Sequence, residues 1–529
     1  MTINIRLSVK PWYRFAAWLE KVPWCYLVLM PAAALSIGSI LYFVSIDAIV
    51  AYGDAESHLN IAKRVVHSLT PGVAQLGGIW LPLPHVLMIP FVFFDPLWRT
   101  GLAGSIVSSL CYLLACAYVY KLAKLLTGQK LASIVASVAF FTNPNILYLQ
   151  STAMTELPLI AFFTLSTYYF VKFLKGKKDV LPLLLAALFG FCAAMTRYDG
   201  WFLVAIEAGI ILLNGLFSRW SWKKIEGHIV IFSTLAFFGM ALWLLWGQLI
   251  LGNAFYFTQS EFSARTQQQA WLAKGQLPAY QNLPLAFIYY FVTAMSNSGI
   301  VLFLASLVGL VLFIRKTSEK VRLLIALLLL VPLIFYVVTL FIGQSVIFIP
   351  HLTPVGFEWR LFNVRYGVMM VPVIAFLFGY LFSQVPRVGK VFLLGLFVVQ
   401  FVFYGIGYSK VISLEDGTVG LSHAKRPDAE AWMKANYDGG LVLIDDYART
   451  LSILRSGIPM QQIIYIGNKP YWEESLKTPE KYATWVVMQR NDAVWVNIIE
   501  KKEVENRLYS HFEKVYTSPE ILIFKRVKS

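Results

Sequence analysis

The chain has 529 residues, of which 58% are hydrophobic and only 14% are charged, and its mean hydropathy is +0.63. A surface that faces water cannot cover so much apolar side chain with so few charges, so the composition excludes an ordinary soluble protein. The formal net charge is +16. Because much of this charge lies in short loops between apolar stretches, it predicts contact with anionic lipid and no binding to nucleic acid.

About eleven apolar stretches approach the roughly 20 residues that a helix needs to cross the hydrocarbon core of a bilayer. They cover residues 24–46, 101–120, 131–149, 157–174, 180–196, 201–217, 229–251, 287–314, 321–343, 366–384 and 391–408. Broken or re-entrant helices would change this count by about two. The sequence therefore predicts a polytopic α-helical membrane protein.

Lysine and arginine residues gather in every second loop and so predict the orientation of the chain. They lie in the N-terminal tail and in the loops at 121–130, 172–178, 219–224, 315–322 and 387–390, which are predicted to be cytoplasmic. Met1–Lys21 lacks the long apolar core of a signal peptide, so the first span is predicted to be a retained anchor. The sequence has no Asn-x-Ser/Thr glycosylation motif, which favours a prokaryotic cell membrane.

The composition changes after residue 409, where charged residues mix with short apolar runs. We predict a membrane part over residues 1–409 and a soluble extracytoplasmic α/β domain over residues 410–529. Strands are expected at 441–444, 463–466, 485–488 and 521–524, and helices at 427–435, 447–454 and 492–512. Asp445 and Asp446 follow the first strand and lie either in a binding crevice or at a solvated strand end.

The first extracytoplasmic loop begins with an acidic cluster, Gly53-Asp54-Ala55-Glu56-Ser57-His58. Asp54 is either a catalytic carboxylate or the N-cap of the helix that follows. Glu56 and His58 lie in the same turn, whereas an N-cap needs only one acceptor. The cluster therefore favours a catalytic role for Asp54. The helix expected over Leu59–Leu69 has one apolar and one polar face, so we expect it to lie in the membrane interface.

Other polar residues fall at the extracytoplasmic ends of predicted spans. His85 follows the Trp80 segment and is either a structural histidine or part of the site. Glu156 starts a span after Thr155; it either takes part in the chemistry or complements the dipole of a helix that Thr155 caps.

Two further groups combine arginine with acidic or aromatic residues. In the first, Arg197, Tyr198 and Asp199 join two spans, where the arginine binds substrate or merely pairs with Asp199. The second is a loop that contains Glu358, Arg360 and Arg365. A cation at membrane depth is costly, so these arginines either hold an anionic group such as a phosphate or extend to lipid headgroups.

These features resemble the GT-C membrane glycosyltransferases, and most closely the branch with the protein O-mannosyltransferases and the bacterial lipid A aminoarabinose transferases. The resemblance covers the membrane part, through the acidic first loop, the Thr155-Glu156-Leu157-Pro158 turn, the number of spans and the external C-terminal domain. It implies a catalytic role for Asp54. A second acidic residue of the family motif, often adjacent, is matched here only by Glu56, and the later acidic position matches Glu156.

The resemblance implies a sugar donor linked through phosphate to a polyprenyl chain, and a lipid, glycan or protein acceptor with a hydroxyl group. Asp54 would act as general base and arginines would stabilise the leaving phosphate. The residues expected to bind substrate are His58, His85, Arg197, Tyr198, Asp199, Glu358, Arg360 and Arg365. No cofactor is certain; Asp54, Glu56 and His58 are candidate ligands for a divalent metal, although they do not make a complete ligand set.

Two other classes of protein remain open from the sequence. A transporter or lipid flippase would also carry charges and broken helices along its path, but its site would lie at the midplane, whereas the polar residues here lie on one side. A non-catalytic scaffold would use the external domain to bind a partner, and its activity would not depend on Asp54.

Overall fold

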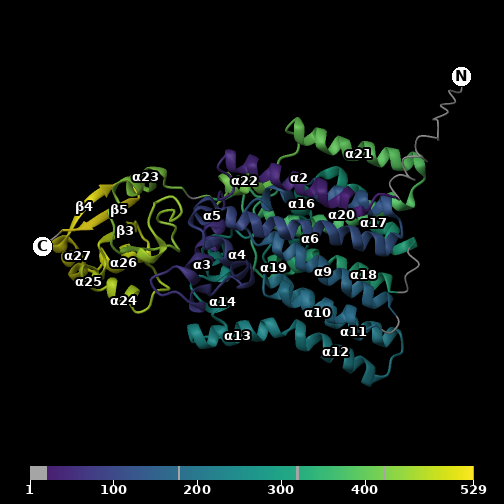
Figure 1. Ribbon diagram of the computed structural model, residues 1–529, viewed down its shortest axis with the longest axis horizontal. Coiled ribbons are helices and arrows are strands. Elements are labelled where there is room, and N and C mark those ends of the chain that lie inside the picture. Colours follow the sequence, from purple (N-terminus) through teal and green to yellow (C-terminus); the bar gives the residue numbers. More distant parts are fainter. Residues whose placement is uncertain (1–20, 177–178, 317–320, 422, 424, 528–529) are drawn as a thin grey trace.

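The computed structural model describes residues 21–176, 179–316, 321–421, 423 and 425–527. The basic residues Arg6, Lys10 and Arg14, on which the predicted cytoplasmic N-terminus rests in part, lie outside these ranges. A bundle of apolar helices forms one end of the molecule and a small domain with a β-sheet forms the other, with the short helices α3, α4 and α5 between them (Figure 1).

Within the described ranges, six helical segments are long and apolar enough to cross a membrane. They are α2 (Trp24–Ser45), α6 (Leu102–Thr127), α9 (Glu156–Lys175), α11 (Tyr198–Phe217), the segment Val364–Gln384 and α21 (Arg387–Gly405). The segment Val364–Gln384 consists of η2 (Val364–Met370) and α20 (Val371–Gln384). These segments confirm the multi-pass helical architecture.

Three other predicted spans are bent pairs of helices. The bend is 42° between α12 (Trp222–Ala236) and α13 (Phe238–Leu251), and 51° between α18 (Arg322–Leu329) and α19 (Val331–Phe341). Between α16 (Leu283–Ser298) and α17 (Ile300–Lys316) it is 115°, so the stretch 287–314 is not one continuous helix. Gly299 makes this turn possible because its φ of +87° lies in the left-handed region.

Two more predicted spans are shorter than expected. The stretch 131–149 divides into α7 (Lys130–Phe141) and α8 (Pro144–Leu149), and the stretch 180–196 contains α10 (Leu181–Ala194). With each bent pair taken as one span, the described residues give up to nine spans by length and composition. The predicted number of eleven stays a prediction.

Asparagine side chains bind the backbone where these helices break. Asn143 and Asn145 both donate to the carbonyl oxygen of Asn297, at 2.9 and 3.0 Å. Asn297 Nδ2 in turn donates to the carbonyl oxygen of Val364, at 2.7 Å. A broken backbone inside a membrane protein needs such partners because the bilayer offers none. The network fixes Val364, and therefore the position of its neighbour Arg365.

Helix α22 (Ile412–Val419) follows the last apolar helix and packs on the membrane part, against α8 and η2. Ser413 donates from its backbone and its side chain to Asn145 Oδ1, at 3.0 and 2.8 Å. The structure therefore places residues 412–419 with the membrane part, whereas the predicted boundary at residue 410 assigns them to the C-terminal domain.

The segment between α2 and α6 contains α3 (Gly53–Val66), η1 (Val73–Leu76), α4 (Leu83–Val92) and α5 (Asp95–Thr100). Both faces of the helix predicted at 59–69 are covered by other parts of the chain, and its position in the membrane interface stays a prediction. Lys63 and Arg64 on the polar face are buried, and they pair with Asp95 and Asp446. The helix therefore lies between the membrane part and the C-terminal domain. A later loop carries α14 (Tyr256–Gln259) and α15 (Ala264–Ala273).

The C-terminal domain has a five-stranded mixed sheet in the order β2-β1-β3-β5-β4. The strands are β1 (Val442–Ile444), β2 (Ile463–Ile464), β3 (Trp485–Gln489), β4 (Phe512–Thr517) and β5 (Ile521–Arg526). Strand β1 is parallel to β2 and β3, whereas β5 is antiparallel to β3 and β4. The four predicted strands are confirmed, and β4 is an additional one.

The helices of this domain are α23 (Pro427–Asn436), η3 (Met460–Gln462), α24 (Tyr471–Ser475), α25 (Pro479–Tyr482), α26 (Ala493–Ile498) and α27 (Lys502–His511). The predicted helix 492–512 is two helices followed by the start of β4. The helix predicted over 447–454 does not form; the backbone makes turns there. Arg449 has a φ of +54°, which is incompatible with a right-handed helix.

Candidate active site

Asp54 lies in the first turn of α3 and is held by two arginines from distant parts of the chain. Arg365 Nη2 donates to its Oδ2 at 2.8 Å, and Arg449 Nη2 donates to its Oδ1 at 2.6 Å. Tyr52 occupies the N-cap position of α3. The N-cap alternative for Asp54 is therefore wrong, since both carboxylate oxygens bind guanidinium groups.

Arg365, at the start of η2, joins three carboxylates. In addition to Asp54, its Nε donates to Glu156 Oε1 at 3.1 Å, and its Nη1 lies 3.9 Å from Asp416 Oδ2. The side chain is only 4% exposed. Within the described residues, Nη1 has no hydrogen-bond acceptor. Arg365 is thus the centre of the cluster and keeps one buried N–H group available for an anion.

Glu156, at the start of α9, also binds a second arginine. Arg197 Nη1 lies 3.3 Å from Glu156 Oε1 and donates to the hydroxyl of Thr155 at 3.0 Å. Arg197 Nε lies 3.4 Å from Asp199 Oδ2, so the pairing within the Arg197-Tyr198-Asp199 turn is present as well. Among the described residues, Thr155 makes no side-chain cap and Glu156 Oε2 has no hydrogen-bond partner.

Aromatic rings surround the two buried arginines. The Arg365 guanidinium lies 4.8 Å from the ring centre of Tyr52 and 5.2 Å from that of Tyr366. Arg197 lies 5.0 Å from the Tyr366 ring and donates to the hydroxyl of Tyr336 at 3.3 Å. Such rings exclude water and attract cations through their faces. They therefore hold the guanidinium groups in fixed positions.

The arginines determine the charge of Asp54. Burial alone would raise its pKa, but Arg449, Arg365 and His58 outweigh burial and lower it. Asp416 has the opposite balance: burial raises its pKa to about 6, although Arg365 opposes the change. Near neutral pH, Asp54 is therefore a full carboxylate, and so it can accept a hydrogen bond or a proton.

The sequence missed two members of this cluster. Arg449 lies in the C-terminal domain, in a segment that was predicted to be helical, and no motif marks it. Asp416 was assigned to the same domain, yet its Oδ2 accepts from the hydroxyl of Tyr52 at 3.0 Å. Both residues come from beyond residue 409, whereas the prediction sought the site in the membrane part alone.

Glu56 and His58 lie on the same helix as Asp54 but bind other groups. Glu56 Oε1 accepts from the backbone of Leu454 at 3.3 Å, and burial raises its pKa to about 7. His58 Nδ1 lies 2.9 Å from His85 Nε2. Burial lowers the pKa of His58 to about 4, although Asp54 opposes this change, so the ring is neutral.

The fit of a metal to these residues is poor. Among the described residues, no three His, Cys, Asp or Glu side chains are arranged to hold a metal ion. Both oxygens of Asp54 bind arginines, and Glu56 binds the C-terminal domain. The predicted ligand set of Asp54, Glu56 and His58 is therefore not assembled.

Three predicted substrate-binding residues lie apart from the cluster. Glu358 is exposed and pairs with Lys274 at 3.0 Å. Arg360 is exposed and donates to the carbonyl oxygen of Pro350 at 2.6 Å. The hydroxyl of Tyr198 donates to the carbonyl oxygen of Ile79 at 2.7 Å. The structure thus brings together Asp54, Glu156, Arg197, Asp199 and Arg365 from the predicted set.

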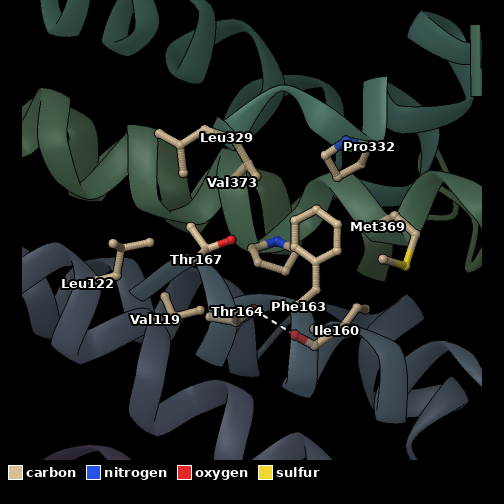
Figure 2. Close-up of a pocket in the computed structure, with 11 residues that line it drawn as sticks. Val119, Leu122, Ile160, Phe163, Thr164, Thr167, Leu329, Pro332, Met369 and Val373 are labelled. Atoms are coloured by element: carbon tan, nitrogen blue, oxygen red, sulfur yellow. Dashed lines mark hydrogen bonds between the residues drawn. The ribbon is translucent and has the colours of Figure 1, made fainter. Parts of the chain in front are cut away.

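An apolar pocket lies within the helical bundle, on the membrane side of this cluster. Figure 2 shows it between α6, α9, the α18–α19 pair and the segment Val364–Gln384. Ile160 in its wall lies one helical turn beyond Glu156, and Met369 lies one turn beyond Arg365. The pocket therefore lies about one helical turn deeper in the apolar bundle than the two charged residues, neither of which lines it.

Comparisons with known proteins find a matching family model and solved structures with a similar fold. A family model described as Dolichyl-phosphate-mannose-protein mannosyltransferase matches residues 97–246. The structure of ArnT from Cupriavidus metallidurans bound to undecaprenyl phosphate has a TM-score of 0.57 at 13% identity, over 95% of this chain and 98% of that chain. ArnT in the apo state has a TM-score of 0.53 at 12% identity, over 93% and 98%. No curated protein matches the chain in sequence.

These matches confirm the resemblance to the GT-C membrane glycosyltransferases. The likeness in fold extends over nearly the whole of both chains, and the matched family consists of glycosyltransferases. The predictions of a GT-C fold and of a glycosyltransferase enzyme are confirmed at this level.

Proposed function

We propose that the chain transfers a sugar from a polyprenyl-phosphate donor to an acceptor hydroxyl on the extracytoplasmic face of the membrane. The observation that supports this proposal most is the position of the cluster. Asp54, Arg365, Glu156 and Arg197 lie together at one end of the helical bundle, and an apolar pocket lies about one helical turn deeper in the bundle. A donor with a charged phosphate and an apolar chain needs a cluster of charged residues for the phosphate and, deeper in the bundle, an apolar pocket for the chain.

The apolar pocket suits the start of the polyprenyl chain, since burial of apolar surface drives binding. The phosphate would then lie beside Arg365, whose buried Nη1 has no hydrogen-bond acceptor among the described residues. An arginine donates to phosphate in a planar fork and forms strong charge-assisted bonds. Arg197 contacts the same carboxylate oxygen as Arg365, Glu156 Oε1, and helps to neutralise it.

In the reaction, the acceptor oxygen forms a bond to the anomeric carbon while the bond from that carbon to the phosphate oxygen breaks. The electron pair of the broken bond stays on the lipid phosphate, where Arg365 stabilises the growing negative charge. The proton of the acceptor hydroxyl passes to Asp54, which acts as general base. An attack opposite the leaving phosphate inverts the anomeric centre.

Purified protein tests this proposal directly. We expect labelled sugar to leave a polyprenyl-phosphate donor and to appear on envelope lipids or glycans extracted from cells that lack the protein. The same sugar presented as a nucleotide derivative is the control and should not be consumed. If the protein cleaves none of a panel of polyprenyl-phosphate sugars, the proposed function is wrong.

The orientation is a separate expectation, and surface labelling of single cysteines checks it. Ser510 is exposed on α27 of the C-terminal domain, and Ser218 is exposed in a loop between α11 and α12. We expect a membrane-impermeant maleimide to label Ser510→Cys in intact cells and to label Ser218→Cys only after lysis. The reverse pattern would place Asp54 and the C-terminal domain in the cytoplasm.

A further inference from the structure

Two buried histidines meet beside the charged cluster. His58 lies one helical turn after Asp54 on α3. Its Nδ1 lies 2.9 Å from Nε2 of His85, near the start of α4. The two residues are 2% and 0% exposed. Leu83 in the same turn of α4 donates its N–H to the carbonyl oxygen of Met195 at 3.0 Å. The turn that carries His85 is therefore fixed to the membrane part.

His58 is the member of the pair that lies closer to the cluster. Burial lowers the pKa of both rings, so both are neutral near pH 7. After burial, Asp54 has the largest effect on the pKa of His58, and three arginines of the cluster follow. For His85 the second cause of the lowered pKa is His58 itself. Since Nδ1 of His58 is engaged with His85, Nε2 is the nitrogen that remains for a ligand.

The pair has two possible arrangements of its protons, because only one of the two facing nitrogens can donate. If His58 donates, His85 carries its own proton on Nδ1. That atom is buried and has no hydrogen-bond partner among the described residues, and a buried N–H group without an acceptor is rare and costly.

If His85 donates instead, its Nδ1 carries no proton and the proton of His58 is on Nε2. This arrangement leaves no buried N–H group of the pair without an acceptor. The carboxylate of Asp54 favours it too, because Asp54 is the charge with the largest effect on His58. The pair is therefore most stable when His58 presents an Nε2–H group.

A neutral N–H group beside Asp54 suits a hydroxyl oxygen better than a phosphate. Phosphate forms its strongest hydrogen bonds with charged donors, and Arg365 already supplies one to the site. The half-buried ring of Trp80 packs against His58, with 4.6 Å between the ring centres. A tryptophan ring offers apolar surface next to this donor. A sugar, with its C–H groups and hydroxyls, matches both features.

We propose that Nε2–H of His58 donates a hydrogen bond to a hydroxyl of the sugar on the polyprenyl-phosphate donor, and that His85 is the positioning residue that fixes His58 in this tautomer. His85 acts through His58 and does not touch the substrate. The inference rests on the proposed function, because it places the sugar of the donor in the same site.

The test separates the tautomer from the packing of the pair. His85→Gln keeps a side-chain N–H group that can donate to His58, whereas His85→Leu fills the space without a donor. His511→Leu makes the same change at an exposed histidine of α27 and is the matched control. The probes are the polyprenyl-phosphate sugar that the wild type cleaves and polyprenyl phosphate without a sugar, used as an inhibitor.

We expect His85→Leu to raise the KM for the donor about fivefold or more, as the loss of one hydrogen bond requires. His85→Gln and His511→Leu should stay close to the wild type. Inhibition by polyprenyl phosphate should be the same in all variants, because it has no sugar to contact His58. If His85→Leu does not fold, His58→Phe decides, since it removes Nε2 and should raise the KM in the same way.

Three results would overturn the inference: an unchanged KM in folded His85→Leu, a His85→Gln variant as impaired as His85→Leu, or an equal loss of affinity for the lipid without a sugar. The last of these would give the histidines a purely structural role. If the wild type cleaves no donor, the proposed function fails and this inference fails with it, a result distinct from any change among the variants.

Discussion

Asp54→Asn is expected to lower sugar transfer by about 10²-fold or more, while the protein still inserts into the membrane. The substitution keeps the shape of the side chain but removes its charge. The carboxylate is the group that both arginines hold ionised, because together they outweigh burial and lower its pKa. An amide at this position can still accept a hydrogen bond, but it cannot take the proton of the acceptor hydroxyl.

Turnover of a labelled donor by the purified variant checks this expectation. Asp428→Asn removes an exposed carboxylate in the first turn of α23 and should leave turnover unchanged. Membrane yield and elution as a single species show that each variant is folded. Turnover close to that of the wild type in Asp54→Asn would contradict the role of Asp54 as general base, and it would favour the scaffold alternative.

The membrane part of the site was predictable from the sequence to a large extent. Asp54, Glu156, Arg197 and Arg365 each stand out because a charged residue beside an apolar span is costly unless it has a partner or a function. The structure brings these four together. What the sequence could not give was the pairing: Arg365 joins Asp54 and Glu156 across 311 and 209 residues of chain.

The remaining errors have local physical causes. Hydropathy averages over a window, so it cannot detect that Gly299 turns the chain by 115° within an apolar stretch. The amphipathic pattern of α3 correctly indicates a helix, but its polar face is covered by the C-terminal domain through Arg64 and Asp446. Arg449 was missed for the same reason, because only the docking of that domain brings it to Asp54.

Arg365→Lys tests the centre of the cluster and should reduce transfer by about ten- to a hundredfold. Lysine keeps the positive charge, but its single ammonium group cannot bind Asp54, Glu156 and a phosphate in the planar fork that arginine offers. The loss of one charge-assisted hydrogen bond costs about 1.5–3 kcal/mol, and each 1.4 kcal/mol or so of barrier is a factor of about ten in rate.

Arg365→Ala should have a larger effect, because it leaves Asp54, Glu156 and Asp416 without their shared cation. Removing one partner from a buried ion pair costs about 3–5 kcal/mol of folding free energy. We therefore expect a lower yield of folded protein in addition to lost turnover, whereas the lysine variant should fold.

The matched control for both variants is Arg360→Lys, since Arg360 is exposed and donates to a backbone carbonyl of its own loop. Donor saturation curves should show a raised KM, a lowered kcat or both for Arg365→Lys, and neither change for Arg360→Lys. The opposite result would place the phosphate at the loop around residues 351–360. In that case Arg365 would serve only to neutralise the carboxylates that the fold gathers around it.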